Sequence, residues 1–251
     1  MGELEGIAKR AVGRVLDLLY PPRCASCDAL LESMARGRPF CGECHSELAL
    51  FVGPTCARCG AATAEVATPG GGCGLCRGVR YHFDRVIALG QYSGLLRHLV
   101  LRAKHAHEEH VAHGLGRLLY EHCGDSLREL QADLVVPVPM HWRRRWWRRS
   151  NSPEAIAATL ARHLAARTHF RQLRRVRGTP PQTSVPGSER FANVRRAFAV
   201  RGKRRLHALH VLLVDDVLTT GATSSEAARA LREAGAGRVT VAVVARSWVG
   251  K

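Results

Sequence analysis

The residues that could do the most specific chemistry in this chain follow one apolar stretch. Residues 211–223 read VLLVDDVLTTGAT, so Asp215 and Asp216 come directly after four apolar residues. Four consecutive apolar residues are typical of a strand that is buried on both faces of a parallel sheet. Ligands of such sheets bind at the carboxyl ends of the strands. We therefore expect a ligand site where this strand ends.

The turn after the two acids is suited to binding a phosphate group. Adjacent backbone amides at the start of a helix can surround a phosphate, and the positive end of the helix dipole favours its negative charge. Hydroxyl groups add further donors, and a glycine lets the backbone approach the ligand closely. The residues of this turn are Thr219, Thr220, Gly221, Ala222 and Thr223.

The two acids need a different binding partner, because a carboxylate accepts hydrogen bonds and repels a phosphate. Asp215 and Asp216 suit a neutral, hydroxylated group beside the phosphate, such as a ribose. The sequence therefore predicts a ribose 5-phosphate site. A structural interpretation stays open, in which the acids only end a strand and the threonines only cap a helix. A P-loop nucleotidase is not supported, since the motif G-x-x-x-x-G-K-[ST] does not occur.

This stretch closely resembles the phosphoribosyl-diphosphate (PRPP) binding motif of type I phosphoribosyltransferases, which is an apolar strand, two acids and V-x-T-T-G-x-T. The resemblance implies that Asp215 and Asp216 act as the catalytic acids that hold the 2′- and 3′-hydroxyls of the ribose. It also implies that residues 219–223 hold the 5′-phosphate. Such enzymes work mainly by positioning and by charge stabilisation, with Mg²⁺ bound together with PRPP at the leaving diphosphate.

The second group of residues with a defined chemistry is formed by cysteines. Eight of the nine cysteines form four C-x-x-C pairs; thirteen residues separate the two pairs of each half, and the pattern repeats after 32 positions. Four thiolates at such spacing form a tetrahedral structural zinc site. The duplication predicts two small zinc ribbons in tandem. The predicted zinc ligands are Cys24, Cys27, Cys41, Cys44, Cys56, Cys59, Cys73 and Cys76.

Other interpretations of the cysteines are less consistent with the sequence. A disulfide framework is typical of secreted proteins, and nothing that resembles a secretory signal precedes the cysteines. Redox-active C-x-x-C motifs do not require four pairs in one segment. The pairing stays open between consecutive and interleaved halves, although the spacing favours consecutive ones. The ninth cysteine, Cys123, is expected to be a buried thiol in a helix.

Charge suggests a second kind of partner. The 251 residues carry a net charge of +17, and only four of the 38 basic residues are lysines. Arginines are interleaved with Trp142, Trp146 and Trp147 at residues 142–149, and further arginines gather at 171–177 and 195–205. Such a pattern suits single-stranded nucleic acid, because aromatic faces stack on bases and guanidinium groups follow phosphates. A GC-rich coding bias, or tryptophans that pack a loop, would explain the same composition.

The remaining sequence indicates how these residues are positioned. Residues 1–20 predict a short amphipathic helix, and residues 21–80 contain the cysteines of the double zinc-ribbon module. From 81 to 251, apolar segments alternate with helical ones, which is typical of an α/β fold with a parallel sheet. We expect the type I phosphoribosyltransferase fold there. No apolar run reaches the roughly 18–20 residues of a membrane span, and we expect a cytoplasmic protein.

Several other segments narrow the resemblance to the ComF competence-protein family. Its stretch V-P-V-P-L-H-x-x-R-x-x-x-R-G-F-N-Q lines up with residues 136–152, and the resemblance extends from about residue 16 to residue 247. Asn151 matches this stretch, whereas Arg149, Ser150 and Ser152 replace its Gly, Phe and Gln. The motifs R-x-R-x-T-x-x-Q and R-x-x-N-V-x-x-A-F match at Arg175, Arg177, Thr179, Gln182, Arg190, Asn193, Val194, Ala197 and Phe198.

The ComF resemblance implies further roles. His141, Arg144 and Arg148 would meet the diphosphate, because guanidinium groups match phosphate oxygens; a solvated basic turn is the alternative. Residues 179–188 would form a lid over the site, and Lys104 stands where the family has a lysine. The protein would then be a transferase that uses PRPP and an unknown acceptor. Alternatively, it would be a non-catalytic single-stranded DNA-binding protein of DNA uptake and transformation, with a DNA-uptake helicase or ATPase as a candidate partner.

Overall fold

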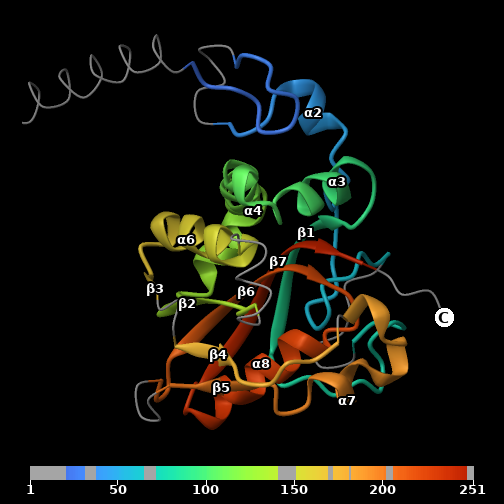
Figure 1. Cartoon of the computed structure of the whole chain (residues 1–251), viewed down its shortest axis with the longest axis vertical. Helices are drawn as coiled ribbons and strands as arrows, with labels where there is room; N and C mark the ends of the chain where they lie inside the picture. The colour runs from blue at the N-terminus through green and yellow to red at the C-terminus, as the bar shows by residue number, and fades with distance from the viewer. Residues whose placement is uncertain are drawn as a thin grey trace, which may run out of the picture. The chain divides into compact units, whose positions relative to one another are not determined.

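The computed structural model describes residues 21–31, 38–64, 72–140, 151–168, 172–180, 182–201 and 206–247 (Figure 1). The amphipathic helix expected at residues 1–20 and the basic loop at 141–150 lie outside these ranges. The chain divides into two compact units, Met1–Glu47 and Leu48–Lys251. Among the described residues, no helix combines the length and the apolar character that a membrane crossing requires.

The smaller unit contains the first two C-x-x-C pairs. Its short helix α2 (Gly42–Ser46) begins after Cys41, whose side chain accepts a hydrogen bond from the Cys44 amide. The turn after Cys24 is closed by a hydrogen bond from the Asp28 amide to the Cys24 carbonyl, at 2.9 Å. Asp28 has a φ of +63°, a conformation that aspartate tolerates better than most residues. Tight backbone turns thus place the thiols of this unit near one another.

The larger unit is built on a parallel five-stranded sheet, as the sequence predicts. Its strand order is β1 (Arg85–Gln91), β7 (Arg238–Arg246), β6 (His210–Leu218), β2 (Leu134–Pro137) and β3 (Arg167–Thr168). Each neighbouring pair runs parallel. Residues 211–214 of the central strand β6 have no exposed surface, because helices cover both faces of the sheet. The fold class is confirmed.

Strand β6 is longer than the sequence predicts. We expected the strand to end at Val214, but it continues through both acids to Leu218. The neighbouring strand β7 extends to Arg246 and supplies the pairing partners, with Asp215 opposite Val243 and Leu218 opposite Arg246. Ladder pairing with β7 therefore holds the backbone at Asp215, Val217 and Leu218, on both sides of Asp216, which fixes where the acids lie relative to the following turn.

Helices lie on both faces of the sheet (Figure 1). On one face, α3 (Gly94–Arg102), the 3₁₀ turn η2 (Ala106–Glu108), α4 (Glu109–Glu129) and α6 (Ser152–Leu164) follow one another. Helix α6 ends at Leu164, because Ala165 adopts a left-handed conformation (φ 50°), and the chain then enters β3. On the other face lies α8 (Ala222–Glu233), whose buried alanines and Leu231 pack on the sheet.

A small layer packs beside α8 (Figure 1). It consists of the antiparallel pair β4 (Leu173–Arg175) and β5 (Phe198–Val200) with helix α7 (Arg190–Val194). The segment predicted to be a lid contains two 3₁₀ turns, η3 (Gln182–Ser184) and η4 (Gly187–Glu189). The Arg177 side chain donates to the Asn193 carbonyl at 2.8 Å, and the Asn193 amide donates to the Pro180 carbonyl at 3.2 Å. Side-chain hydrogen bonds therefore tie this segment to α7.

Candidate functional site

The turn between β6 and α8 has a shape that only glycine allows at one position. Gly221 has a φ of +81° and precedes the first residue of α8. A Cβ atom at Gly221 would lie 2.8 Å from Cε1 of Tyr81, which is closer than a real contact. The Gly221 carbonyl accepts a hydrogen bond from the Ser225 amide at 2.8 Å and so begins the helix. The turn therefore presents backbone amides at the N-terminus of a twelve-residue helix.

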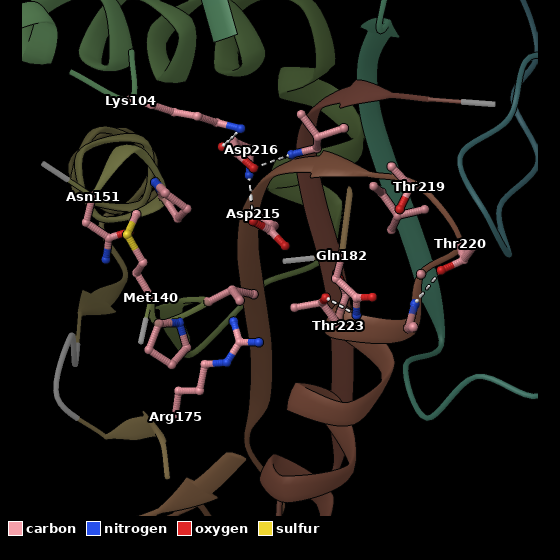
Figure 2. A pocket seen from close by; sticks show the side chains of 18 of the residues that line it. Lys104, Met140, Asn151, Arg175, Gln182, Asp215, Asp216, Thr219, Thr220 and Thr223 are labelled. Carbon is pink, nitrogen blue, oxygen red and sulfur yellow. Dashed lines mark hydrogen bonds and ion pairs between the residues drawn. The ribbon is translucent and has the colours of Figure 1, made fainter. Parts of the chain in front are cut away.

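A cavity of about 270 Å³ opens at this turn and contains all of the predicted ribose and phosphate residues. Figure 2 shows the threonines of the turn on one side of the two acids, and Met140, Asn151 and Arg175 on the other. The structure thus brings together residues from α6, β4, β6, α8 and the segment that follows β2. The predicted residues that line the cavity are Asp215, Asp216, Thr219, Thr220, Gly221, Ala222 and Thr223.

The two acids have different environments. Asp215 is buried, and its Oδ1 accepts a hydrogen bond from the Asp216 amide at 2.9 Å. Burial, and then the charge of Asp216, raise the pKa of Asp215 well above its ordinary value. Asp216 instead accepts hydrogen bonds at both oxygens, from the Val217 amide at 2.8 Å and from the Ser152 hydroxyl at 3.3 Å. The pair therefore offers one strongly hydrogen-bonded carboxylate and one that resists ionisation.

Lys104 supplies the positive charge beside the acids. Its Nζ lies 3.1 Å from Oδ2 of Asp216 (Figure 2). Burial lowers the pKa of Lys104, but the Asp216 carboxylate outweighs this effect, so the net pKa lies above the ordinary value. Lys104 is therefore a cation at neutral pH. The sequence offered it only through the family pattern, because it lies after α3, more than 100 residues before the acids.

The segment that contains the two downstream family motifs contacts the phosphate turn directly. The side-chain amide of Gln182 donates to the Thr223 hydroxyl at 3.3 Å, and the side-chain amide of Asn193 donates to Gln182 Oε1 at 3.5 Å. Arg175 lines the cavity, and its guanidinium lies 5.5 Å from the centre of the Phe198 ring. Arg175 and Gln182 therefore form part of the cavity wall, and Asn193 holds Gln182 from outside it. The diphosphate candidates His141, Arg144 and Arg148 lie outside the described residues.

Asn151 has an unusual environment in this cavity. It precedes α6 and contributes its side chain to the cavity wall. Both its amide nitrogen and its amide oxygen are buried, and neither has a hydrogen-bond partner in the part of the chain that the structure describes. Leaving such a group unsatisfied costs about 1–3 kcal/mol. A ligand with a donor and an acceptor would remove this cost.

The cysteines form two clusters of four, made of consecutive pairs, as their spacing favours. One contains Cys24, Cys27, Cys41 and Cys44, the other Cys56, Cys59, Cys73 and Cys76, and within each the Sγ atoms lie within 4.8 Å of one another. Individual Sγ–Sγ distances are 3.8 Å for residues 27 and 41, 3.8 Å for 56 and 76, and 3.5 Å for 59 and 73. A tetrahedral ion with Zn–S bonds of about 2.3 Å separates its sulfurs by about 3.8 Å. Both clusters therefore fit zinc.

Cys123 belongs to neither cluster. It lies in α4 at a kink, where its φ and ψ of −109° and 16° leave the helical range. Burial raises the pKa of its thiol to about 11. The partly buried thiol is therefore protonated at neutral pH, which agrees with the structural role expected for it.

Comparison with known proteins identifies both parts of the chain. Residues 15–78 match the double zinc ribbon domain, and residues 154–249 match the phosphoribosyl transferase domain. Competence protein F of Haemophilus influenzae is 30% identical over 228 residues, which cover 89% of this chain and 90% of that protein. The DNA utilization protein YhgH of Salmonella typhimurium is 33% identical over 179 residues, which cover 70% of this chain and 78% of that protein.

Among solved structures, the glutamine phosphoribosylpyrophosphate amidotransferase from B. subtilis aligns with 47% of this chain and 25% of its own, at 24% identity and a TM-score of 0.31. The family assignment depends instead on the near full-length match to competence protein F and on the order of the two domains. This chain, with its double zinc ribbon and its phosphoribosyltransferase-type domain, belongs to the ComF family of competence protein F and the DNA utilization protein YhgH.

Proposed function

We propose that the cavity at the carboxyl end of β6 binds PRPP or a related 5-phosphorylated ribose, and that the protein transfers the phosphoribosyl group to an acceptor. One observation carries the proposal. Two acids, one of them hydrogen-bonded at both oxygens, lie in the same cavity as a glycine-dependent turn at a helix N-terminus. A sugar phosphate has hydroxyls that the acids can bind and a phosphate anion that the turn can bind.

Each part of the ligand has a counterpart in the cavity. The amides and hydroxyls of residues 219–223 would bind the 5′-phosphate. Asp216, oriented by its ion pair with Lys104 at 3.1 Å, would accept hydrogen bonds from the ribose hydroxyls. Asp215 would complete the ribose contact from its buried position. Lys104 would thus act by positioning Asp216 and by offsetting the negative charge that the ligand brings.

In the transfer itself, the bond between C1 of the ribose and the diphosphate breaks and the diphosphate keeps the bonding electrons. The acceptor then bonds to C1 and loses a proton. Mg²⁺ that arrives with PRPP would neutralise charge on the departing diphosphate. Arg175, which lines the cavity, and the basic residues His141, Arg144 and Arg148 would bind that group through the same charge complementarity. The unsatisfied amide of Asn151 supports a polar ligand in this part of the cavity.

The test is a calorimetric titration with Mg²⁺-PRPP of the unmodified protein and of Asp216→Asn. Losing a hydrogen bond to a charged group costs about 1.5–3 kcal/mol, so we expect about 10- to 100-fold weaker binding. Asp125→Asn is the matched control, because Asp125 is an exposed acid that pairs with Arg128 on the surface of α4. Unchanged affinity in Asp216→Asn would show that the acids do not hold the ribose. If the unmodified protein binds PRPP, release of diphosphate on addition of a nucleobase would identify nucleobases as the acceptor class.

A second candidate function, single-stranded DNA binding, is favoured by the small layer beside α8. Exposed arginines gather there on β4, next to α7 and after β5, together with Phe191, which is 37% exposed. Guanidinium groups with an aromatic side chain suit single-stranded nucleic acid. The exposed arginines are Arg174, Arg177, Arg195, Arg196 and Arg201.

A salt titration separates this function from the first. Each arginine that contacts a phosphate of single-stranded DNA adds about 0.7 to the slope of log affinity against log salt. We expect Arg174→Ala and Arg195→Ala to reduce that slope and Asp216→Asn to leave it unchanged. If Asp216→Asn weakens DNA binding as strongly as PRPP binding, the DNA occupies the ribose cavity and not the basic layer.

A further inference from the structure

The second cysteine cluster belongs to the same compact unit as the phosphate turn. Cys56, Cys59 and Cys76 have no exposed surface, and Tyr81 packs against them. The first cluster belongs to the other unit, Met1–Glu47. Only the second cluster therefore belongs to the unit that contains the phosphate turn.

Arg246 is the first link between the second cluster and the turn. It ends β7 and is only 5% exposed. Its Nε donates to the Cys59 carbonyl at 2.8 Å, and its Nη1 donates to the Leu218 carbonyl at 2.9 Å and to the Thr219 carbonyl. The guanidinium is planar and its donors form a rigid fork. One side chain thus fixes the backbone of a zinc knuckle relative to the backbone of the phosphate turn.

Tyr81 is the second link. Its hydroxyl donates to the Thr220 carbonyl at 3.2 Å, and its ring edge lies where a side chain on Gly221 would have to be. The same ring stacks on Phe83, with the ring centres 4.6 Å apart, and packs against the cysteine cluster. The next residue, His82, donates its amide to the Ser225 hydroxyl at 3.1 Å in the first turn of α8. Tyr81 and His82 therefore pack directly against the phosphate turn and the first turn of α8.

From these contacts we infer that zinc at the second cluster holds the phosphate turn in its binding conformation through Arg246 and Tyr81. A zinc knuckle has too few apolar contacts to keep its shape without the metal, so ligand geometry and folding are coupled. Losing the metal would free the Cys59 carbonyl and the surface that supports Tyr81. The carbonyls of residues 218–220, which accept hydrogen bonds from Arg246 and Tyr81, would then lose the partners that fix the direction of the amides in the turn. The inference rests on the proposed function.

The test compares one variant in each cluster. Cys76→Ser and Cys44→Ser should each lower the zinc content by one ion per chain. We expect Cys76→Ser to weaken Mg²⁺-PRPP binding by about tenfold or more, the effect of losing one or two buried hydrogen bonds, and Cys44→Ser to change it less than twofold. Equal effects of the two variants overturn the inference.

Two further measurements cover variants that fold poorly and a ligand that is not PRPP. Arg246→Lys and Tyr81→Phe keep all eight cysteines, so each should retain two zinc ions and still bind PRPP more weakly. Hydrogen exchange of the amides at residues 219–225 needs no ligand, and we expect it to be faster in Cys76→Ser than in Cys44→Ser. Equal exchange in the two variants overturns the inference. Faster exchange with no PRPP binding by the unmodified protein overturns only the proposed function.

Discussion

The two cysteine clusters have the same spacing but different neighbours. In the first, Cys27 is exposed, and the adjacent ion pair of Arg23 and Asp28 is exposed as well. In the second, three of the four cysteines are fully buried, and Arg246 and Tyr81 connect the cluster to the phosphate turn. A metal-binding motif can therefore be a small unit of its own or a part of a larger core. The residues around it decide which of the two it becomes.

The largest expected difference between the two clusters is in how much each stabilises the larger unit. Cys56→Ser should lower the free energy of unfolding of the larger unit by about 4 kcal/mol, because losing a structural metal is among the most destabilising single changes. Cys24→Ser should leave the unfolding of that unit unchanged, since Cys24 belongs to the other unit. Urea unfolding of each variant, followed by far-ultraviolet circular dichroism of the helices and strands, measures both changes in stability. Equal losses would mean that the clusters have equivalent roles.

A smaller effect is expected from two glycines, one in each unit. Gly221→Ala places a methyl group against the Tyr81 ring in a backbone conformation with φ +81°, which should cost about 1–3 kcal/mol and weaken PRPP binding. Gly42→Ala adds a methyl group to α2 where no atom lies within 4 Å, so it should be tolerated. Thermal unfolding and calorimetry of the two variants provide the comparison. A harmless Gly221→Ala would mean that Tyr81 does not support the turn.

The last prediction concerns how the stability of the larger unit depends on pH through Asp215. The pKa of Asp215 is raised in the folded protein, chiefly by burial, so the folded state holds a proton that the unfolded state releases. This contribution to stability is fully present below the unfolded pKa of about 4 and is lost as pH rises through the folded pKa, with a slope of up to about 1.4 kcal/mol per pH unit. Asp215→Asn should remove that slope.

The measurement is the difference in free energy of unfolding between Asp215→Asn and the unmodified protein at each pH. Loss of zinc at low pH affects both proteins alike, so the difference isolates Asp215. We expect the variant to gain relative stability as pH rises. A difference that does not change with pH would mean that the pKa of Asp215 is the same in the folded and unfolded states.

The sequence predicts those parts of the site that are contiguous along the chain. Asp215, Asp216 and the turn at 219–223 are neighbours in sequence, and parallel-sheet geometry places the whole stretch at one edge. The spacing of the cysteines left their pairing open but favoured the consecutive pairs that the structure shows. The length of β6 could not be predicted, because it depends on where β7 ends, and alternating or continuous hydrophobicity no longer marks a strand once acids interrupt it.

Residues that reach the site across long separations were predicted only through a family pattern or not at all. Lys104 and Gln182 come from the ComF motifs, whereas the orphaned amide of Asn151 becomes visible only when its surroundings are known. Tyr81 lies 139 residues from Thr220, and nothing in its local sequence marks it as a support for the turn. Arg246 is one arginine in a chain rich in them, so composition conceals its role. Tertiary contacts of this kind carry no local signature.

The Arg246 contact also has a consequence for how the chain acquires its structure during synthesis. The first cluster is complete once Cys44 has left the ribosome, whereas the guanidinium that anchors the Cys59 carbonyl is 187 residues further along than its partner. At typical elongation rates of about 5–20 residues per second, the second knuckle waits on the order of ten seconds or more for β7. During that interval the Tyr81 ring and its apolar surroundings lack their final cover. The nascent chain therefore exposes the apolar surface around Tyr81 until the turn after β6, and then β7, have been synthesised.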